Sequence, residues 1–166
     1  MRLVIDITER RKHSTRLIQA ARYASYSNCK FKSLRGAALW LDDLLIGAGA
    51  NYHDDPKVCD NCPRKYIHDG SRQELCRAEH AEMMALEDAK RKEYRVFRGA
   101  IMYQMKVKDG LISISDDPAC INCASVLAEH GITYVGFLSW GICEFTPAEL
   151  SQYYQRRNRG IEWLNR

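Results

Sequence analysis

Two short motifs, His80-Ala81-Glu82 and Cys120-Ile121-Asn122-Cys123, each stand near the beginning of a predicted helix. The spacing of a CxxC motif lets both sulfurs reach one metal ion. The partial positive charge at a helix N-terminus lowers thiol pKa values, and a metal completes the deprotonation. His80, Cys120 and Cys123 therefore predict one metal site with three protein ligands, in a fold that brings two helix N-termini together.

The donor set indicates a catalytic rather than a structural zinc site. Three protein ligands leave the fourth tetrahedral position open for water, whereas structural zinc sites are closed. Residues two apart do not share a helix face, so we do not expect Glu82 to bind the same metal as His80. Glu82 would instead stand beside the bound water as a proton shuttle. The alternative is a closed zinc-binding module in which Glu82 is a surface residue.

Periodicity and turn residues place these motifs in an α/β domain. Four helices are predicted, over residues 9–27, 78–92, 121–130 and 147–158, the last opened by a capping box at Thr146-Pro147-Ala148-Glu149. Strands are predicted at 35–41 and 44–50 on either side of Asp42-Asp43, and at 100–107 and 111–115 on either side of Asp109-Gly110. A further apolar run predicts a strand at 132–138. The order predicts a single domain over 1–166, with helices on both faces of a central mixed sheet of about five strands.

The paired motifs resemble those of the zinc-dependent cytidine/deoxycytidylate deaminase superfamily, whose signature is H-x-E…P-C-x-x-C. The resemblance extends over residues 14–140 and is greatest to deoxycytidylate (dCMP) deaminase. It implies a three-layer α/β/α cytidine deaminase-like fold, with His80, Cys120 and Cys123 as ligands of a catalytic zinc. It also implies that zinc-bound hydroxide attacks the amino-bearing ring carbon while Glu82 acts as general acid and base.

The same resemblance implies contacts to the substrate. Asn51 follows Gly47-Ala48-Gly49-Ala50 at a strand end where nucleotide deaminases have an asparagine that contacts the sugar. Apart from the resemblance, Trp140 and Phe145 follow the predicted strand at 132–138 and are expected either to stack on the base, as aromatic residues near nucleotide sites do, or to pack in the core or in a lid. The predicted substrate-binding residues are Asn51, Ala81 and Trp140. The chain departs from the signature at Ala119, which separates the proline from the first cysteine and alters the loop into the site.

Seven cysteines need an explanation beyond this site. The N-terminal residues have no apolar centre typical of a signal peptide, so we expect a reducing, cytoplasmic location in which disulfides are disfavoured. Cys59, Cys62 and Cys76 lie in a turn-rich, charged insertion at 51–77. Some deoxycytidylate deaminases carry a similar insertion that binds a second, structural zinc, and these three cysteines are the matching ligands.

The fourth ligand of the second zinc is predicted to be His53, with His68 and Cys29 as alternatives. A closed tetrahedral zinc would order a loop that is too long and too polar to hold itself. The alternative is a set of free thiols on a flexible loop. Cys143 lies beside an aromatic strand end and is expected to be a packed thiol.

The charge distribution bears on the substrate. Residues 1–35 hold nine Lys or Arg against two acidic residues, residues 36–155 hold 12 against 18, and residues 156–166 hold four against one. Basic ends around an acidic middle favour a phosphate-bearing partner or are solvated helix faces. Arg64, Lys65 and Arg77 are candidates for phosphate contacts or are ordinary loop charges. No apolar run approaches the length of a membrane span.

The leading hypothesis is hydrolytic deamination of a free pyrimidine nucleotide, dCMP to dUMP with release of ammonia. The resemblance also implies assembly into a homo-oligomer. The first alternative is a cytidine or adenosine deaminase of polynucleotides, either transfer RNA or single-stranded DNA. The basic ends favour it, whereas the acidic middle that holds the site does not. The second alternative is a zinc-stabilised binding module without enzymatic activity.

Overall fold

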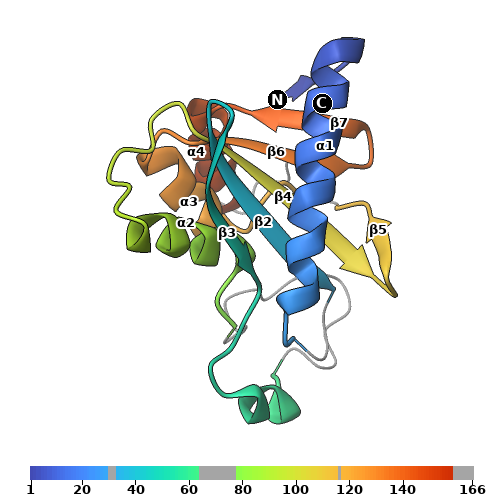
Figure 1. Cartoon of the computed structure of the whole chain (residues 1–166), viewed down its shortest axis with the longest axis vertical. Helices are drawn as coiled ribbons and strands as arrows, with labels where there is room; N and C mark the ends of the chain where they lie inside the picture. The colour runs from blue at the N-terminus through green and yellow to red at the C-terminus, as the bar shows by residue number, and fades with distance from the viewer. Residues whose placement is uncertain (30–32, 64–77, 116, 159–166) are drawn as a thin grey trace.

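The computed structural model describes residues 1–29, 33–63, 78–115 and 117–158 (Figure 1). The strands in these ranges are β1 (Arg2–Leu3), β2 (Leu34–Leu41), β3 (Leu44–Ala50), β4 (Ile101–Lys108), β5 (Leu111–Ser113), β6 (Thr133–Leu138) and β7 (Gly141–Phe145). The α-helices are α1 (Ile7–Tyr23), α2 (Ala81–Arg91), α3 (Ile121–Glu129) and α4 (Pro147–Asn158). Two 3₁₀ helices, η1 (Ala24–Tyr26) and η2 (Pro56–Asn61), complete the described elements.

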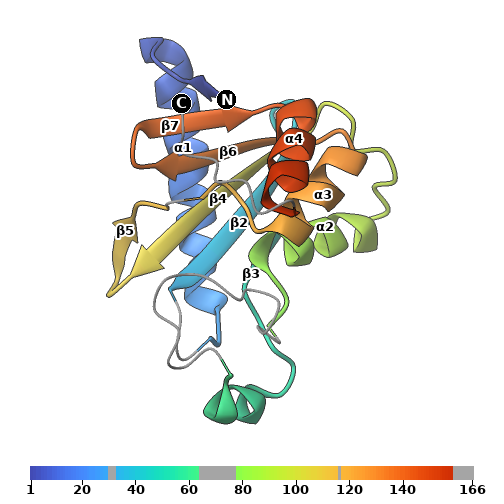
Figure 2. The ribbon, with the colours of Figure 1, turned by 180° about the vertical axis from the view of Figure 1, so that it is seen from behind.

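All seven strands belong to one mixed sheet. Their order is β1-β7-β6-β4-β2-β3, and β5 pairs with β4. The β4–β6 pair is parallel, and the other pairs of described strands are antiparallel. Figures 1 and 2 show α1 on one face of the sheet and α2, α3 and α4 on the other. This arrangement confirms the three-layer α/β/α prediction, but the sheet has seven strands rather than about five.

The additional strands, β1 and β7, lie at one side of the sheet. The burial of β7 does not alternate, since Ile142, Cys143 and Phe145 are all buried, so the period-two signal of a strand is missing. The two residues of β1 pair with β7, and Arg2 bonds both Glu9 (2.5 Å) and Glu144 (2.7 Å). The burial of the Cys143 side chain is that of a packed thiol, as expected from the sequence.

The turns and caps follow the residues that predicted them. Asp109 and Gly110 both adopt positive φ, 53° and 76°, as the tight β4–β5 hairpin requires. At the start of α4 the Thr146 amide donates to Glu149 Oε2 (2.8 Å), and the Glu149 amide donates to Thr146 Oγ1 (3.3 Å), which is a reciprocal capping box. None of the described helices combines the length and apolar character needed to cross a membrane.

Helix α2 lies very close to strand β3 because β3 has glycine where the two elements touch. A Cβ atom at Gly49 would lie 2.5 Å from the Ala85 nitrogen and 2.6 Å from the Ala81 oxygen. One turn further along α2, the Asp88 carboxylate accepts a hydrogen bond from the Ala48 amide (3.0 Å). Gly49 and the hydrogen bond between Ala48 and Asp88 together fix the distance of α2 from the sheet. They therefore also fix the position of the first turn of α2.

The long insertion is closed at its base by a backbone pair. The Tyr52 amide donates to the Glu79 carbonyl (3.0 Å), and the Glu79 amide donates to the Tyr52 carbonyl (2.7 Å). These groups are therefore not available to a helix, so α2 begins at Ala81 and not at residue 78 as predicted. The pair holds the chain in register just before His80.

Candidate metal centre

His80 and Cys120 are the N-caps of α2 and α3. Both have extended backbone conformations, with φ/ψ of −81°/149° and −67°/162°. The Cys120 sulfur accepts a hydrogen bond from the Cys123 amide (3.3 Å), one of the free N–H groups at the start of α3. Each motif is thus at the positive end of a helix, where negative charge on sulfur is stabilised.

The structure brings the three predicted ligands together. His80 Nδ1 lies 3.0 Å from Cys120 Sγ and 3.4 Å from Cys123 Sγ, and the three donor atoms all lie within 4.8 Å of one another. A tetrahedral zinc ion has bonds of about 2.0 Å to nitrogen and about 2.3 Å to sulfur, which require donor atoms at separations of this order. Thiolate and imidazole also favour zinc over magnesium or calcium. The donor set therefore fits a zinc ion.

The two thiols differ in their acidity. The hydrogen bond from the Cys123 thiol, with help from His80, holds the pKa of Cys120 far below its usual range. The same hydrogen bond, together with burial and the Glu82 charge, raises the pKa of Cys123. A metal ion that binds both sulfurs would displace the proton of the hydrogen bond between them.

Glu82 lies in the first turn of α2 and is only 3% exposed, so the alternative of a surface residue is wrong. Burial raises its pKa, the neighbouring Cys120 adds to this effect, and the positive charges of His80 and Arg35 oppose it. A carboxyl group with a raised pKa beside a metal site is suited to exchange protons near neutral pH. Glu82 is therefore a buried carboxyl group with a raised pKa beside the metal donors.

Four further polar residues lie close to this site and were not singled out from the sequence. Arg35 Nη1 donates to Ser115 Oγ (3.1 Å), and Tyr134 donates from its hydroxyl to Gln104 Oε1 (2.9 Å). The positive charge of Arg35 lowers the pKa of Glu82, Cys123 and Tyr134, although burial raises all three. Nothing in the local sequence distinguishes Arg35 from a solvated charge near the start of a strand.

The predicted substrate residues lie in different environments. Asn51 is 7% exposed, and its Oδ1 accepts a hydrogen bond from the Arg35 amide (2.6 Å). Ala81 is fully buried at the start of α2. Trp140 is 46% exposed after β6, so the alternative that it packs in the core is wrong. The inserted Ala119 is buried immediately before α3.

The residues predicted for a second zinc are described only in part. The His53 Nδ1 accepts a hydrogen bond from the Asp55 amide (2.9 Å), and its backbone pairs with the Asn28 side chain (2.6 and 2.9 Å). Cys62 is half-buried. The Cys59 side chain and residues His68 and Cys76 lie outside the described part of the chain, as do Arg64, Lys65 and Arg77.

A second cluster of possible metal ligands has a different explanation. Glu9, His13 and Glu144 bring their ligand atoms within 4.8 Å of one another on the α1 side of the sheet. Arg2 donates to both carboxylates, and His13 Nδ1 lies 2.9 Å from the Tyr103 hydroxyl. The Arg2 guanidinium already supplies the positive charge that this cluster needs.

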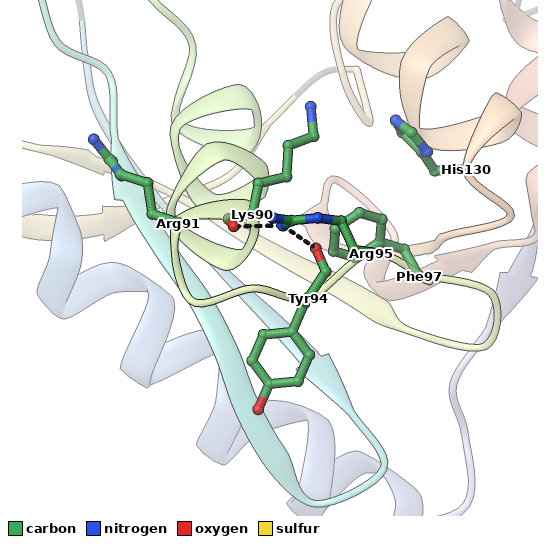
Figure 3. Close-up of a pocket in the computed structure, with 6 residues that line it drawn as sticks. All are labelled: Lys90, Arg91, Tyr94, Arg95, Phe97 and His130. Atoms are coloured by element: carbon green, nitrogen blue, oxygen red, sulfur yellow. Dashed lines mark hydrogen bonds between the residues drawn. The ribbon is translucent and has the colours of Figure 1, made fainter.

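A pocket of about 350 Å³ lies away from the metal donors, at the C-terminal ends of α2 and α3 (Figure 3). Its lining residues are Lys90, Arg91, Tyr94, Arg95, Phe97 and His130. Arg95 Nη1 donates to the Lys90 carbonyl (2.7 Å) and the Tyr94 carbonyl (3.2 Å), and therefore caps the end of α2. In Figure 3 the Arg91 and Tyr94 side chains diverge from Phe97 and His130, so the lining does not converge on one point.

Comparison with solved structures places this geometry in a known fold. Cytidine deaminase from Burkholderia pseudomallei matches with a TM-score of 0.55 and 18% sequence identity, over 83% of this chain and 94% of that chain. The apo dCMP deaminase of cyanophage S-TIM5 matches with a TM-score of 0.49 and 15% identity, over 92% of this chain and 94% of that chain. No family model and no curated protein matches the sequence. The chain therefore has the cytidine deaminase-like fold.

Proposed function

We propose that the protein is a zinc-dependent hydrolytic deaminase of a free pyrimidine nucleotide, converting dCMP and water to dUMP and ammonia. One observation carries the proposal. The buried Glu82 lies in the first turn of the helix that follows His80, and His80 meets the two cysteines at distances that fit zinc. The cytidine deaminase-like fold supports the same activity.

The residues of the site have complementary tasks. His80, Cys120 and Cys123 would hold zinc, which, when bound, supplies chemistry by acidifying a water molecule. Glu82 accepts one proton from that water and delivers it to the ring nitrogen. It then accepts the second proton from the hydroxyl group now bonded to the ring carbon and delivers it to the leaving amino nitrogen. The water oxygen replaces the amino group, ammonia leaves, and Glu82 ends in the protonation state in which it began. The raised pKa of Glu82 matches it to both directions of transfer.

The distribution of exposed basic residues favours a free nucleotide over a polynucleotide as the substrate. The exposed basic residues of the N-terminal helix α1 are Arg10, Arg11, Lys12 and Arg22. Helix α1 covers the face of the sheet opposite α2 and α3 (Figures 1 and 2). A nucleic acid bound along these residues would lie on the face of the sheet opposite the metal donors. The acidic middle segment also repels a polyphosphate backbone.

The test is a substrate panel scored for ammonia release by the zinc-loaded protein. The panel contains deoxycytidine, dCMP, dCTP, cytidine, CMP and a short oligonucleotide that contains cytosine. We expect the highest kcat/KM for dCMP. Release from the oligonucleotide alone would favour the polynucleotide alternative. If a zinc-loaded, folded protein releases ammonia from no compound, the deaminase proposal is wrong and the binding module stands.

We also propose a second, structural zinc held by Cys59, Cys62, Cys76 and His53, which supports the insertion at 51–77. Elemental analysis of the purified protein tests it, with two zinc ions per chain as the expected result and one as the contrary result. The thiol ligands of both sites need a reducing compartment such as the cytoplasm. Assembly into a homo-oligomer stays a prediction, which light scattering checks.

A further inference from the structure

Arg35 is the second residue of β2 and lies on the face of the sheet that carries the metal centre. Successive residues of a strand alternate between faces, so Arg35 shares its face with Ala37 and Leu39. Both of these are fully buried in the core cluster that also contains the first residue of α2. The Arg35 side chain therefore lies in the layer between the sheet and α2 and not in the layer of α1.

The Arg35 guanidinium is hydrogen-bonded to one described side chain and forms no ion pair with a described carboxylate, although its charge acts on Glu82. Its Nη1 donates to Ser115 Oγ (3.1 Å), and Ser115 is 3% exposed. No carboxylate of the described chain forms an ion pair with it. A guanidinium has five N–H donors, so most of those of Arg35 are left for a ligand. A half-buried charge of this kind is costly unless an anion pairs with it.

The charge and the location of Arg35 are those of a substrate contact. Two thiolates would neutralise the double positive charge of a zinc ion. The carboxylate of Glu82 and the guanidinium of Arg35 are then the remaining charged groups of the site. The Arg35 amide donates to Asn51 Oδ1 (2.6 Å), and the Asn51 amide donates to the Arg35 carbonyl (3.1 Å). These bonds place Arg35 directly beside the residue proposed to contact the sugar.

We propose that Arg35, positioned by Ser115, binds the phosphate of the nucleotide substrate and thereby selects a nucleotide over the corresponding nucleoside. This inference rests on the proposed function, because it assigns the substrate class of the same site. The planar fork of arginine binds two phosphate oxygens at once, which a lysine ammonium does not. Ser115 is a positioning residue, since its hydroxyl holds the guanidinium and it is itself buried.

The experiment compares dUMP with deoxyuridine as ligands of the zinc-loaded protein, measured by titration calorimetry. We expect the unaltered protein to bind dUMP at least about tenfold more tightly than deoxyuridine, an effect typical of one charge-assisted contact. Arg35→Gln should abolish this difference and leave the affinity for deoxyuridine unchanged. Arg35→Lys should keep part of the difference in affinity between dUMP and deoxyuridine. Arg22→Gln, on the opposite face of the sheet, is the matched control and should change neither affinity.

Two results would overturn the proposal. The first is equal affinity of the unaltered protein for dUMP and deoxyuridine. The second is an equal loss of both affinities in Arg35→Gln, which would show that Arg35 acts through Glu82. If Arg35→Gln does not fold, Ser115→Ala takes its place and should weaken binding of dUMP alone.

Ammonia release distinguishes this inference from the proposed function. A protein that binds dUMP through Arg35 but releases no ammonia from dCMP would refute the deaminase function and keep the phosphate site. A protein that deaminates dCMP and deoxycytidine with equal kcat/KM, before and after Arg35→Gln, would refute the phosphate site and keep the deaminase.

Discussion

A methyl group on Gly49 would lie 2.6 Å from the carbonyl oxygen of Ala81, the first residue of α2. The atoms in the way belong to the backbone of the helix, which has no rotamer to change. The position of the helix that follows His80 is therefore set by the absence of a side chain on the neighbouring strand.

Gly49→Ala should lower both stability and metal binding. Overpacking against backbone costs about 1–3 kcal/mol of the free energy of unfolding, and moving α2 away from β3 displaces His80 from the cysteines. Denaturant unfolding and zinc titration measure the two effects. Gly110→Ala is the control, since a Cβ there has nothing within 4 Å and only the positive φ opposes it. A Gly49→Ala protein with unchanged zinc affinity would contradict this account of the helix position.

Glu82→Gln should abolish catalysis without loss of zinc. The amide has the shape of the carboxyl group but cannot carry the proton, and general acid–base catalysis contributes about 10²–10⁴-fold to rate. Ammonia release from dCMP and zinc content are the two measurements. Glu79→Gln, at an exposed position three residues earlier, is the matched control and should retain activity. Activity within a few-fold of the unaltered enzyme would exclude Glu82 as the proton shuttle.

Cys123→Ser should remove the catalytic zinc, because a serine hydroxyl is a poor substitute for a buried thiolate ligand. Cys143→Ser provides a comparison at an equally buried cysteine outside the metal centre. It should cost about 1–3 kcal/mol of the free energy of unfolding for an unpaired hydroxyl, and should keep the zinc. Elemental analysis of the two variants measures their zinc content. Loss of zinc from Cys143→Ser would contradict the assignment of Cys123 as a ligand.

His13 should make the free energy of unfolding depend on pH below neutrality. Burial lowers its pKa in the folded protein, although the carboxylates of Glu144 and Glu9 oppose the shift. An unfolded histidine has a pKa of about 6.5, so the unfolded chain binds the proton first as pH falls. The stabilisation is complete above about pH 6.5 and is lost as the pH decreases toward the folded pKa.

The measurement compares the unaltered protein with His13→Asn in the presence of a metal chelator, by denaturant unfolding at pH 7.5 and 5.5. The difference in the free energy of unfolding between the two proteins should shrink at the lower pH. A difference that grows at pH 5.5 would show that Glu9 and Glu144 outweigh burial.

The metal centre was predictable because its residues act locally. His80 and Cys120 stand where a helix starts, and Cys123 follows at the spacing that one metal requires. Hairpin formation at Asp109-Gly110 was predictable for the same reason, since the dipeptide alone favours positive φ.

What surrounds the metal centre depends on contacts between distant parts of the chain. An arginine near the start of a strand is usually a solvated charge, and only the pairing of β2 with both β3 and β4 shows that Arg35 is half-buried. Ser115 lies 80 residues from Arg35, and no local pattern connects them. The start of α2 was misplaced because the backbone of Glu79 pairs with Tyr52, against its own helical preference.

The parallel pairing of β4 with β6 has a consequence for the order of events during folding. His80 and Cys120 are 40 residues apart, and the chain between them includes α2, β4 and β5. Parallel pairing forms slowly, because loop closure must precede the contacts that stabilise it. We therefore expect the three donor atoms to converge late, after the central strands have assembled. A metal ion that needs all three donor atoms would then bind a nearly assembled domain and would stabilise it by mass action.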